Sequence, residues 1–134
     1  MNHPRLTVRS VRARIVRAPM RRPLSTSATR MATVPFLLVD LYTVEGVIGR
    51  AQAFCYMNAA APMMRDMLEA AGELIEGALL EPDGIGRTCR NHFTLLGTSG
   101  IVGMALSALD VACWDALSRA AGLPLGRYLG RGVD

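Results

Sequence analysis

The side chains best suited to chemistry in this chain are two histidines and a pair of aspartates on one predicted helix. His3 lies at the N-terminal end, and His92 falls on a short predicted helix, where a lone histidine usually packs or caps. Asp110 and Asp115 are five residues apart, which separates them by about 140° around a helix axis. They cannot converge on one substrate or one metal ion. Each is therefore expected to be a structural acid, paired with an arginine or a backbone N–H.

The three cysteines, Cys55, Cys89 and Cys113, are odd in number and far apart in the sequence. They form no CxxC motif and have no Cys/His ligand spacing, so neither a structural zinc site nor a disulfide framework is predicted. Reduced thiols are typical of a reducing compartment. The expected location is therefore cytoplasmic.

Recognisable catalytic motifs are missing from the sequence. No Gly-x-Ser-x-Gly motif occurs, and without lysine there is no Walker A motif. The glycine pair Gly84-Ile-Gly86 is more typical of a turn than of a phosphate-binding loop. We therefore predict no catalytic residue and no metal ligand in this chain, and expect it to be inactive alone.

The charge of the chain is strongly asymmetric. The net charge is +4, all fifteen basic residues are arginine, and no acidic residue precedes Asp40. The arginine-rich segment before Asp40 is compatible with a nucleic-acid-binding patch or a transit peptide. Residues 6–16, however, alternate apolar and basic side chains, which favours an antiparallel strand with one solvated face. Because no aromatic residue before Phe36 could stack on bases, we expect no nucleic-acid partner.

The spacing of apolar and turn residues predicts three strands followed by three helices. The strands are expected at 6–18, 34–43 and 47–54, with a long loop over 20–33 and a tight turn at Gly46. Three strands followed by helices is an α+β pattern with the helices segregated to one side.

The helices should follow Asn58. This residue is expected to cap an amphipathic helix that carries Pro62 in its first turn. After a break at 81–84, a shorter helix is predicted to run to Leu96. A longer helix follows and stops at Gly122, with a last turn around Tyr128.

The longest predicted helix is apolar on nearly every side. Its two stripes consist of Ile101, Ala105, Ala108, Ala112 and Ala116, and of Val102, Leu106, Leu109, Cys113 and Leu117. A helix that is apolar all round is a buried helix, yet a small domain has little interior. We therefore expect a partner surface to cover the second stripe. The uncharged window around it contains Asn91, His92 and a Gly-Thr-Ser-Gly loop, so no membrane span is predicted.

A family resemblance becomes specific in the same helix. The run Ala-Leu-Asp-x-Ala-x-Trp-Asp-x-Leu begins at Ala108 and is followed by Gly-Leu-Pro-Leu and Leu-Gly. With Pro-Phe-Leu-Leu-Val-Asp-Leu-Tyr-Thr over 35–43 and Phe-Cys-Tyr over 54–56, it resembles the mandelate racemase and muconate lactonizing enzyme family of the enolase superfamily. The resemblance covers 8–130 and is closest to mandelate racemase.

This resemblance implies a fold and a function. The whole of 1–134 would be an N-terminal capping domain, an antiparallel meander followed by a helical bundle, over a TIM-type barrel that this chain lacks. The complete enzyme, a racemase or acid-sugar dehydratase, would abstract the proton α to a carboxylate. Its base and its Mg²⁺ would lie on the barrel. Expected partners are a hydroxy acid or sugar acid, the barrel and further copies of the chain. The alternative is a non-catalytic module that binds a partner through an exposed apolar helix face.

By resemblance, two loops would contact the substrate. Leu24, Met31 and Phe54 would form an apolar wall, with the hydroxyls of Thr26 and Tyr56 near the polar end of the substrate. The alternative is that Leu24 and Phe54 belong to the core and that Tyr56 is an ordinary half-buried phenol. A further set of arginines in the first loop, Arg21, Arg22 and Arg30, would suit a doubly anionic or sugar-acid substrate better than mandelate.

Overall fold

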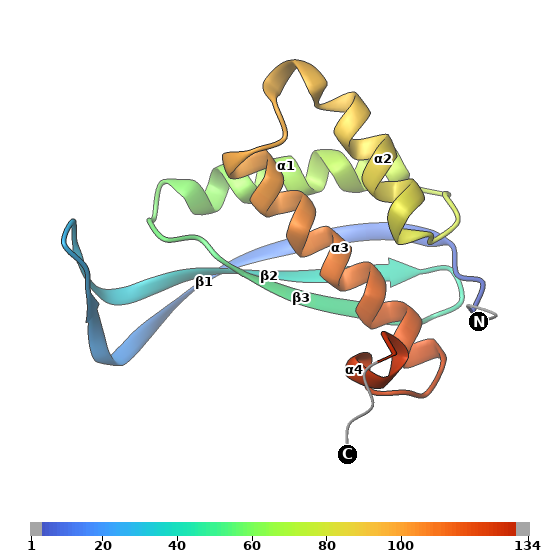
Figure 1. The fold of residues 1–134 in the computed structure, drawn as a ribbon, viewed down its shortest axis with the longest axis horizontal. Coiled ribbons are helices and arrows are strands. Elements are labelled where there is room, and N and C mark those ends of the chain that lie inside the picture. Colours follow the sequence, from blue (N-terminus) through green and yellow to red (C-terminus); the bar gives the residue numbers. More distant parts are fainter. Residues whose placement is uncertain (1–3, 131–134) are drawn as a thin grey trace.

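The computed structural model describes residues 4–130, which form a three-stranded sheet covered by helices (Figure 1). The strands are β1 (Val8–Ser25), β2 (Arg30–Thr43) and β3 (Ile48–Phe54), paired antiparallel in the order β1-β2-β3. Gly46 has a φ of 85° in the turn between β2 and β3. The predicted meander is therefore confirmed. His3 lies outside the described residues.

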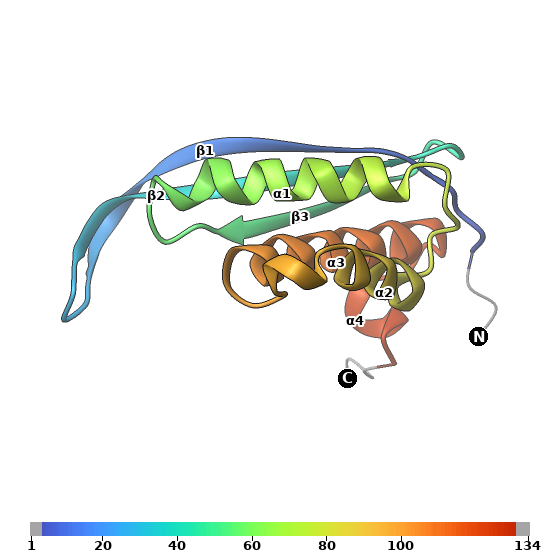
Figure 2. The same cartoon turned by 90° about the horizontal axis from the view of Figure 1, so that it is seen from above.

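The helices pack on one face of the sheet (Figure 2). They are α1 (Ala60–Ile75), α2 (Pro82–His92), a 3-10 turn η1 (Thr94–Leu96), α3 (Gly100–Ala120) and α4 (Leu125–Tyr128). Helix α1 lies against β1 and α3 lies against β3, while α2 contacts both helices. This segregation confirms the α+β class.

The exposed face of the sheet carries the charges that the alternation predicted. Val11 on β1 is buried against the helices, whereas Arg12 and Arg14 are exposed. Asp40 on β2 lies 3.2 Å from Nη2 of Arg14 and 3.5 Å from Nε of Arg50 on β3. Arg12 and Arg14 therefore line the solvent-exposed face of β1, as expected.

The predicted loop over 20–33 is wrong. Both strands continue into this region and form a long hairpin arm, defined here as 18–33, which extends away from the helices (Figure 1). Its strands are irregular between Pro19 and Leu24. Pro19 and Pro23 are tolerated in β1 because it is an edge strand, where an absent N–H on the solvent side costs no ladder bond.

The predicted cap of α1 is also wrong. The helix starts after Ala59, which makes no side-chain capping bond, although Pro62 does lie in the first turn. The side-chain oxygen of Asn58 instead accepts a hydrogen bond from Nε of Arg17, at 3.1 Å. The side-chain oxygen that the local sequence predicted as a helix cap therefore binds a guanidinium group from β1 instead.

Helix α3 is covered on both stripes by this chain itself. In the first stripe, Ala112 and Ala116 approach the backbone of Gly49 on β3. In the second, Leu109 and Leu117 are each 1% exposed. The expectation that a partner covers the second stripe is therefore wrong, because α1 and α2 both pack against α3. The alternative function based on an exposed face of this helix loses its premise.

Within residues 4–130, α3 is the helix whose length and composition would allow it to cross a membrane. Its apolar residues join the core cluster that the sheet and the other helices share. Burial inside the domain therefore accounts for the composition of α3.

Candidate functional site

An aromatic cluster marks the end of β3. The rings of Phe36 and Phe54, register partners on β2 and β3, lie 5.6 Å apart at 85°. The ring of Tyr56 meets that of Phe54 at 4.7 Å and 78°. Both pairs have the edge-to-face geometry that the aromatic quadrupole favours. Phe36 and Phe54 are partly buried, whereas Tyr56 is 61% exposed, so the cluster presents a phenol to its surroundings.

The backbone that carries Tyr56 is strained. Tyr56 has a φ of 62°, and among residues 4–130 no other residue except glycine has a positive φ. The N–H of Met57 donates to the carbonyl of Cys55 at 2.6 Å, which closes a γ-turn of the rare type centred on Tyr56. Such conformations cost about 1–3 kcal/mol and concentrate at functional sites. This turn directs Tyr56 outward while buried Cys55 anchors the chain before it.

The tip of the hairpin arm holds the other three predicted residues. Leu24 and Met31 are register partners, Leu24 is 42% exposed and Met31 is half-buried. The hydroxyl of Thr26 donates to the carbonyl of Thr29 at 3.2 Å and accepts from its N–H at 3.1 Å. Thr26 therefore closes the turn at the arm tip.

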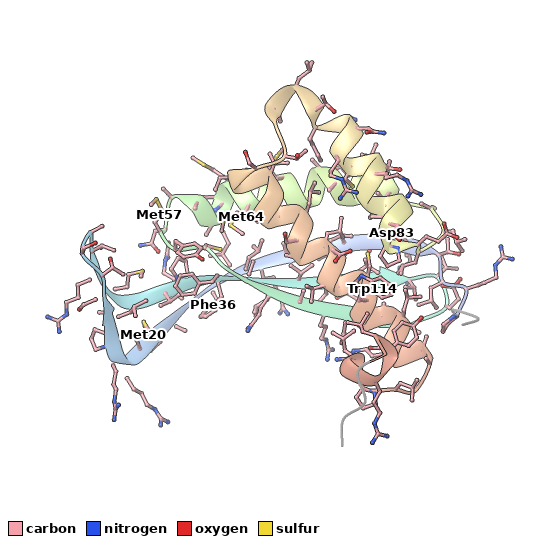
Figure 3. All side chains as sticks on the ribbon, viewed as in Figure 1. Met20, Phe36, Met57, Met64, Asp83 and Trp114 are labelled. Carbon is pink, nitrogen blue, oxygen red and sulfur yellow. The ribbon has the colours of Figure 1, made fainter. Side chains whose placement is uncertain are left out.

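The two groups lie at the same end of the sheet, because β1 and β3 end where β2 begins. Figure 3 shows Met20 on the arm and Phe36 and Met57 near its base, far from Asp83 and Trp114. Met31 and Phe36 are five residues apart on β2, or roughly 17 Å along the strand. The described residues thus present two separate groups, and their assignment to a substrate pocket stays a prediction.

Sequence reasoning missed two residues at this end. Phe36 completes the aromatic cluster, and the alternation of β2 could have placed it opposite Phe54 on the exposed face. Arg17 reaches the loop after Tyr56 through Asn58, a contact that no local pattern signals.

The two aspartates of α3, Asp110 and Asp115, lie in different environments. Asp115 accepts from the backbone N–H of Arg50 at 2.8 Å and from Nε of Arg119 at 2.6 Å, as predicted for a structural acid. Burial, and then the charge of Asp83, raise the pKa of the Asp110 carboxyl. A hydrogen bond from Trp114 and the charge of Arg90 partly oppose that rise in pKa.

The remaining reactive side chains are structural. Cys55, Cys89 and Cys113 are free and buried, and burial raises the pKa of Cys113 to about 12. A thiol with that pKa stays protonated and unreactive at neutral pH. The ring of exposed His92 packs edge-on against Phe93 at 5.0 Å in the last turn of α2, in line with a packing or capping role.

Two hollows of the surface lie away from the predicted lid. A groove of about 640 Å³ lies between α2 and α3, and Asp83, Arg90 and Asp110 are among its lining residues. A smaller one of about 350 Å³ borders Trp114. Neither is lined by any of the five predicted substrate residues. Within 4–130, no group of three or more His, Cys, Asp or Glu side chains could hold a metal ion.

A three-stranded antiparallel meander with helices on one face is the architecture of an enolase-type N-terminal domain. Residues 9–130 match the family model described as mandelate racemase / muconate lactonizing enzyme, N-terminal domain. The chain belongs to this family.

Similar proteins include an enolase and two sugar-acid dehydratases. An enolase from Bradyrhizobium, crystallised with magnesium and mandelic acid, is 36% identical with a TM-score of 0.88, over 95% of this chain and 35% of that one. An L-talarate dehydratase from Polaromonas is 22% identical with a TM-score of 0.83, over 96% and 36%, and shares the fold. A probable glucarate dehydratase from Streptomyces coelicolor is 25% identical over 80% of this chain and 28% of that protein. This chain thus spans about a third of the length of these relatives.

Proposed function

We propose that this chain is the capping and specificity domain of an enolase-superfamily enzyme that removes the proton α to a carboxylate. The observation that carries the proposal is the common position of the hairpin arm and the Tyr56 loop at one end of the sheet. Both expose side chains there, and a strained turn fixes the direction of Tyr56. If the barrel packs against that end of the sheet, the hairpin arm and the Tyr56 loop would both cover the substrate in its active site.

The chemistry itself would belong to the barrel. The described residues do not fit a magnesium site, and the sequence has no lysine to act as base. We therefore assign no proton transfer and no metal ligand to this chain. Its contribution is to exclude water and to select the distal part of the substrate, which strengthens electrostatic interactions in the closed site.

The charge of the arm supports an anionic substrate. Arg21, Arg22 and Arg30 all lie exposed on the arm. Two or three guanidinium groups on a lid favour a doubly charged sugar acid over a singly charged aromatic hydroxy acid. The similarity to a probable glucarate dehydratase from Streptomyces supports a sugar-acid substrate. The mandelic acid bound in the Bradyrhizobium structure supports an aromatic hydroxy acid instead. Rates on matched panels of both acids decide between them.

The isolated chain should not exchange the α-proton of any 2-hydroxy acid or sugar acid with deuterium in the presence of Mg²⁺. The reason is the absence of lysine and of converging carboxylates. Proton NMR measures the exchange against a sample without protein. Exchange should arise when this domain is joined to a barrel domain of the family and vanish again when the domain is removed. Exchange by the chain alone would show that the chemistry lies here.

In the complete enzyme, Tyr56→Phe should lower kcat/KM for the preferred acid without lowering the melting temperature. Its phenol is exposed, so the fold loses little, whereas one hydrogen bond to a substrate contributes about 0.5–1.5 kcal/mol. That corresponds to roughly a two- to twelvefold loss in kcat/KM. Tyr42→Phe on the exposed sheet face is the matched control. An unchanged kcat/KM across the acid panel would make Tyr56 an ordinary surface phenol.

A further inference from the structure

The loop after β3 is attached to the sheet from both faces. Before the turn, the ring of Phe54 contacts Phe36 on the exposed face, and the N–H of Cys55 donates to the carbonyl of Pro35 at 3.0 Å. After the turn, Asn58 accepts from Nε of Arg17 at 3.1 Å. The loop therefore passes around the end of the sheet between two separate attachments.

Arg17 occupies a position where the strand pattern calls for an apolar residue. It follows Val11, Ala13 and Ile15 on the helix-covered face of β1, and those three join the core cluster. Arg17 instead lies exposed beyond the core, opposite Pro35, which is its register partner on β2. The paired residues Arg17 and Pro35, at the base of the arm, thus both bind the loop. Pro35 supplies the carbonyl that accepts from Cys55, and Arg17 supplies the guanidinium that donates to Asn58.

The strained turn at Tyr56 needs restraint on both sides. A positive φ at a residue with a side chain persists only where the surroundings over-determine it. Upstream, buried Cys55 and its backbone bond to Pro35 hold the chain. Downstream, Met57 and Asn58 are exposed, and α1 starts without a side-chain cap. The Arg17–Asn58 hydrogen bond is a side-chain link that joins this downstream half to β1 at the base of the arm.

We propose that Arg17 is a positioning residue: through Asn58 it holds the strained turn at Tyr56 and couples the hairpin arm to the Tyr56 loop, so that the two segments move as one lid. The coupling itself is a property of this chain alone. Its consequence for substrate selection rests on the proposed function.

Hydrogen exchange of the 134-residue chain tests the coupling. The amide of Met57, which closes the turn at 2.6 Å, is the reporter, and the amide of Leu68 in the core of α1 reports global opening. Arg17→Met keeps the apolar stem and removes the donor. We expect exchange at Met57 to rise about three- to tenfold with no change at Leu68. Arg17→Lys should retain part of the protection, and Arg14→Met, which removes an ion pair on the opposite face, should leave Met57 unaffected.

A second pair of variants isolates the bond from effects on the helix. Asn58→Asp turns the acceptor into a carboxylate, which should slow exchange at Met57 in the parent chain. In the Arg17→Met background most of that gain should be lost, and the slowing that remains measures the effect of the carboxylate on the helix alone. A carboxylate near the start of α1 also stabilises the helix by itself. Equal slowing in both backgrounds, or unchanged exchange in Arg17→Met, would overturn the proposal.

The complete enzyme separates this inference from the proposed function. Arg17→Met should lower kcat/KM by about the same factor as Tyr56→Phe, and the double variant should lose little more, because both act through one group. If Tyr56→Phe leaves kcat/KM unchanged while the exchange results hold, the coupling stands and the pocket assignment fails. If exchange at Met57 is insensitive to Arg17, the coupling fails whatever the kinetics show.

Discussion

Gly49→Ala should destabilise the domain by about 3 kcal/mol or more, which is a loss of over a hundredfold in the folding equilibrium. Gly49 lies on β3 where α3 crosses the sheet. A Cβ there would overlap the carbonyl oxygen of Ala112 and lie 2.8 Å from Cβ of Ala116. The nearest obstacle is helix backbone, which cannot rotate away, so α3 must move off the sheet. Thermal unfolding should show a midpoint lower by roughly 10 °C.

Gly84→Ala is the matched control for this prediction. Gly84 lies in the first turn of α2, and an added Cβ there would meet only side-chain atoms of Glu81, at 3.6 and 3.7 Å, in ordinary van der Waals contact. Alanine there should leave stability unchanged or raise it slightly, because it has the higher helix propensity. A Gly49→Ala domain as stable as the Gly84→Ala domain would contradict the close packing of α3 on β3.

Phe54→Ala should lower kcat/KM of the complete enzyme for its preferred acid by about ten- to a hundredfold. The ring of Phe54 stands between those of Phe36 and Tyr56, so its removal breaks both edge-to-face pairs. Each pair contributes about 0.5–1.5 kcal/mol beyond its buried area, and each 1.4 kcal/mol is a factor of ten. Tyr56 would then lose the surface against which its strained turn is built. Steady-state rates on hydroxy acids and sugar acids measure the loss.

A loss of stability must be separated from a loss of specificity in this variant. Phe93→Ala removes another aromatic ring, which is 6% exposed and lies between α2 and η1, away from the lid segments. It should lower the melting temperature at least as much as Phe54→Ala, yet leave the ratio of kcat/KM between acids unchanged. If both variants changed that ratio equally, Phe54 would act through stability alone.

Local sequence patterns were sufficient to predict the class of the fold and the family. Alternation over β1, the turn at Gly46 and the amphipathic spacing of α1 are local signals, and local periodicity survives in the folded chain. The motif on α3 and the 35–43 segment identified the family for the same reason, since each is a contiguous run of residues. The structural role of Asp115 also followed from helix geometry alone.

Other features depend on residues that are distant in sequence and meet only in the folded chain. The arm over 18–33 became strand because β1 and β2 pair with each other there, despite two prolines and no apolar alternation. The second stripe of α3 needed no partner, because α1 and α2 cover it. Asn58 does not cap α1, because its side chain accepts a hydrogen bond from Arg17, 41 positions away. These outcomes result from competition between a local preference worth about 1 kcal/mol and contacts that form only when the chain has folded.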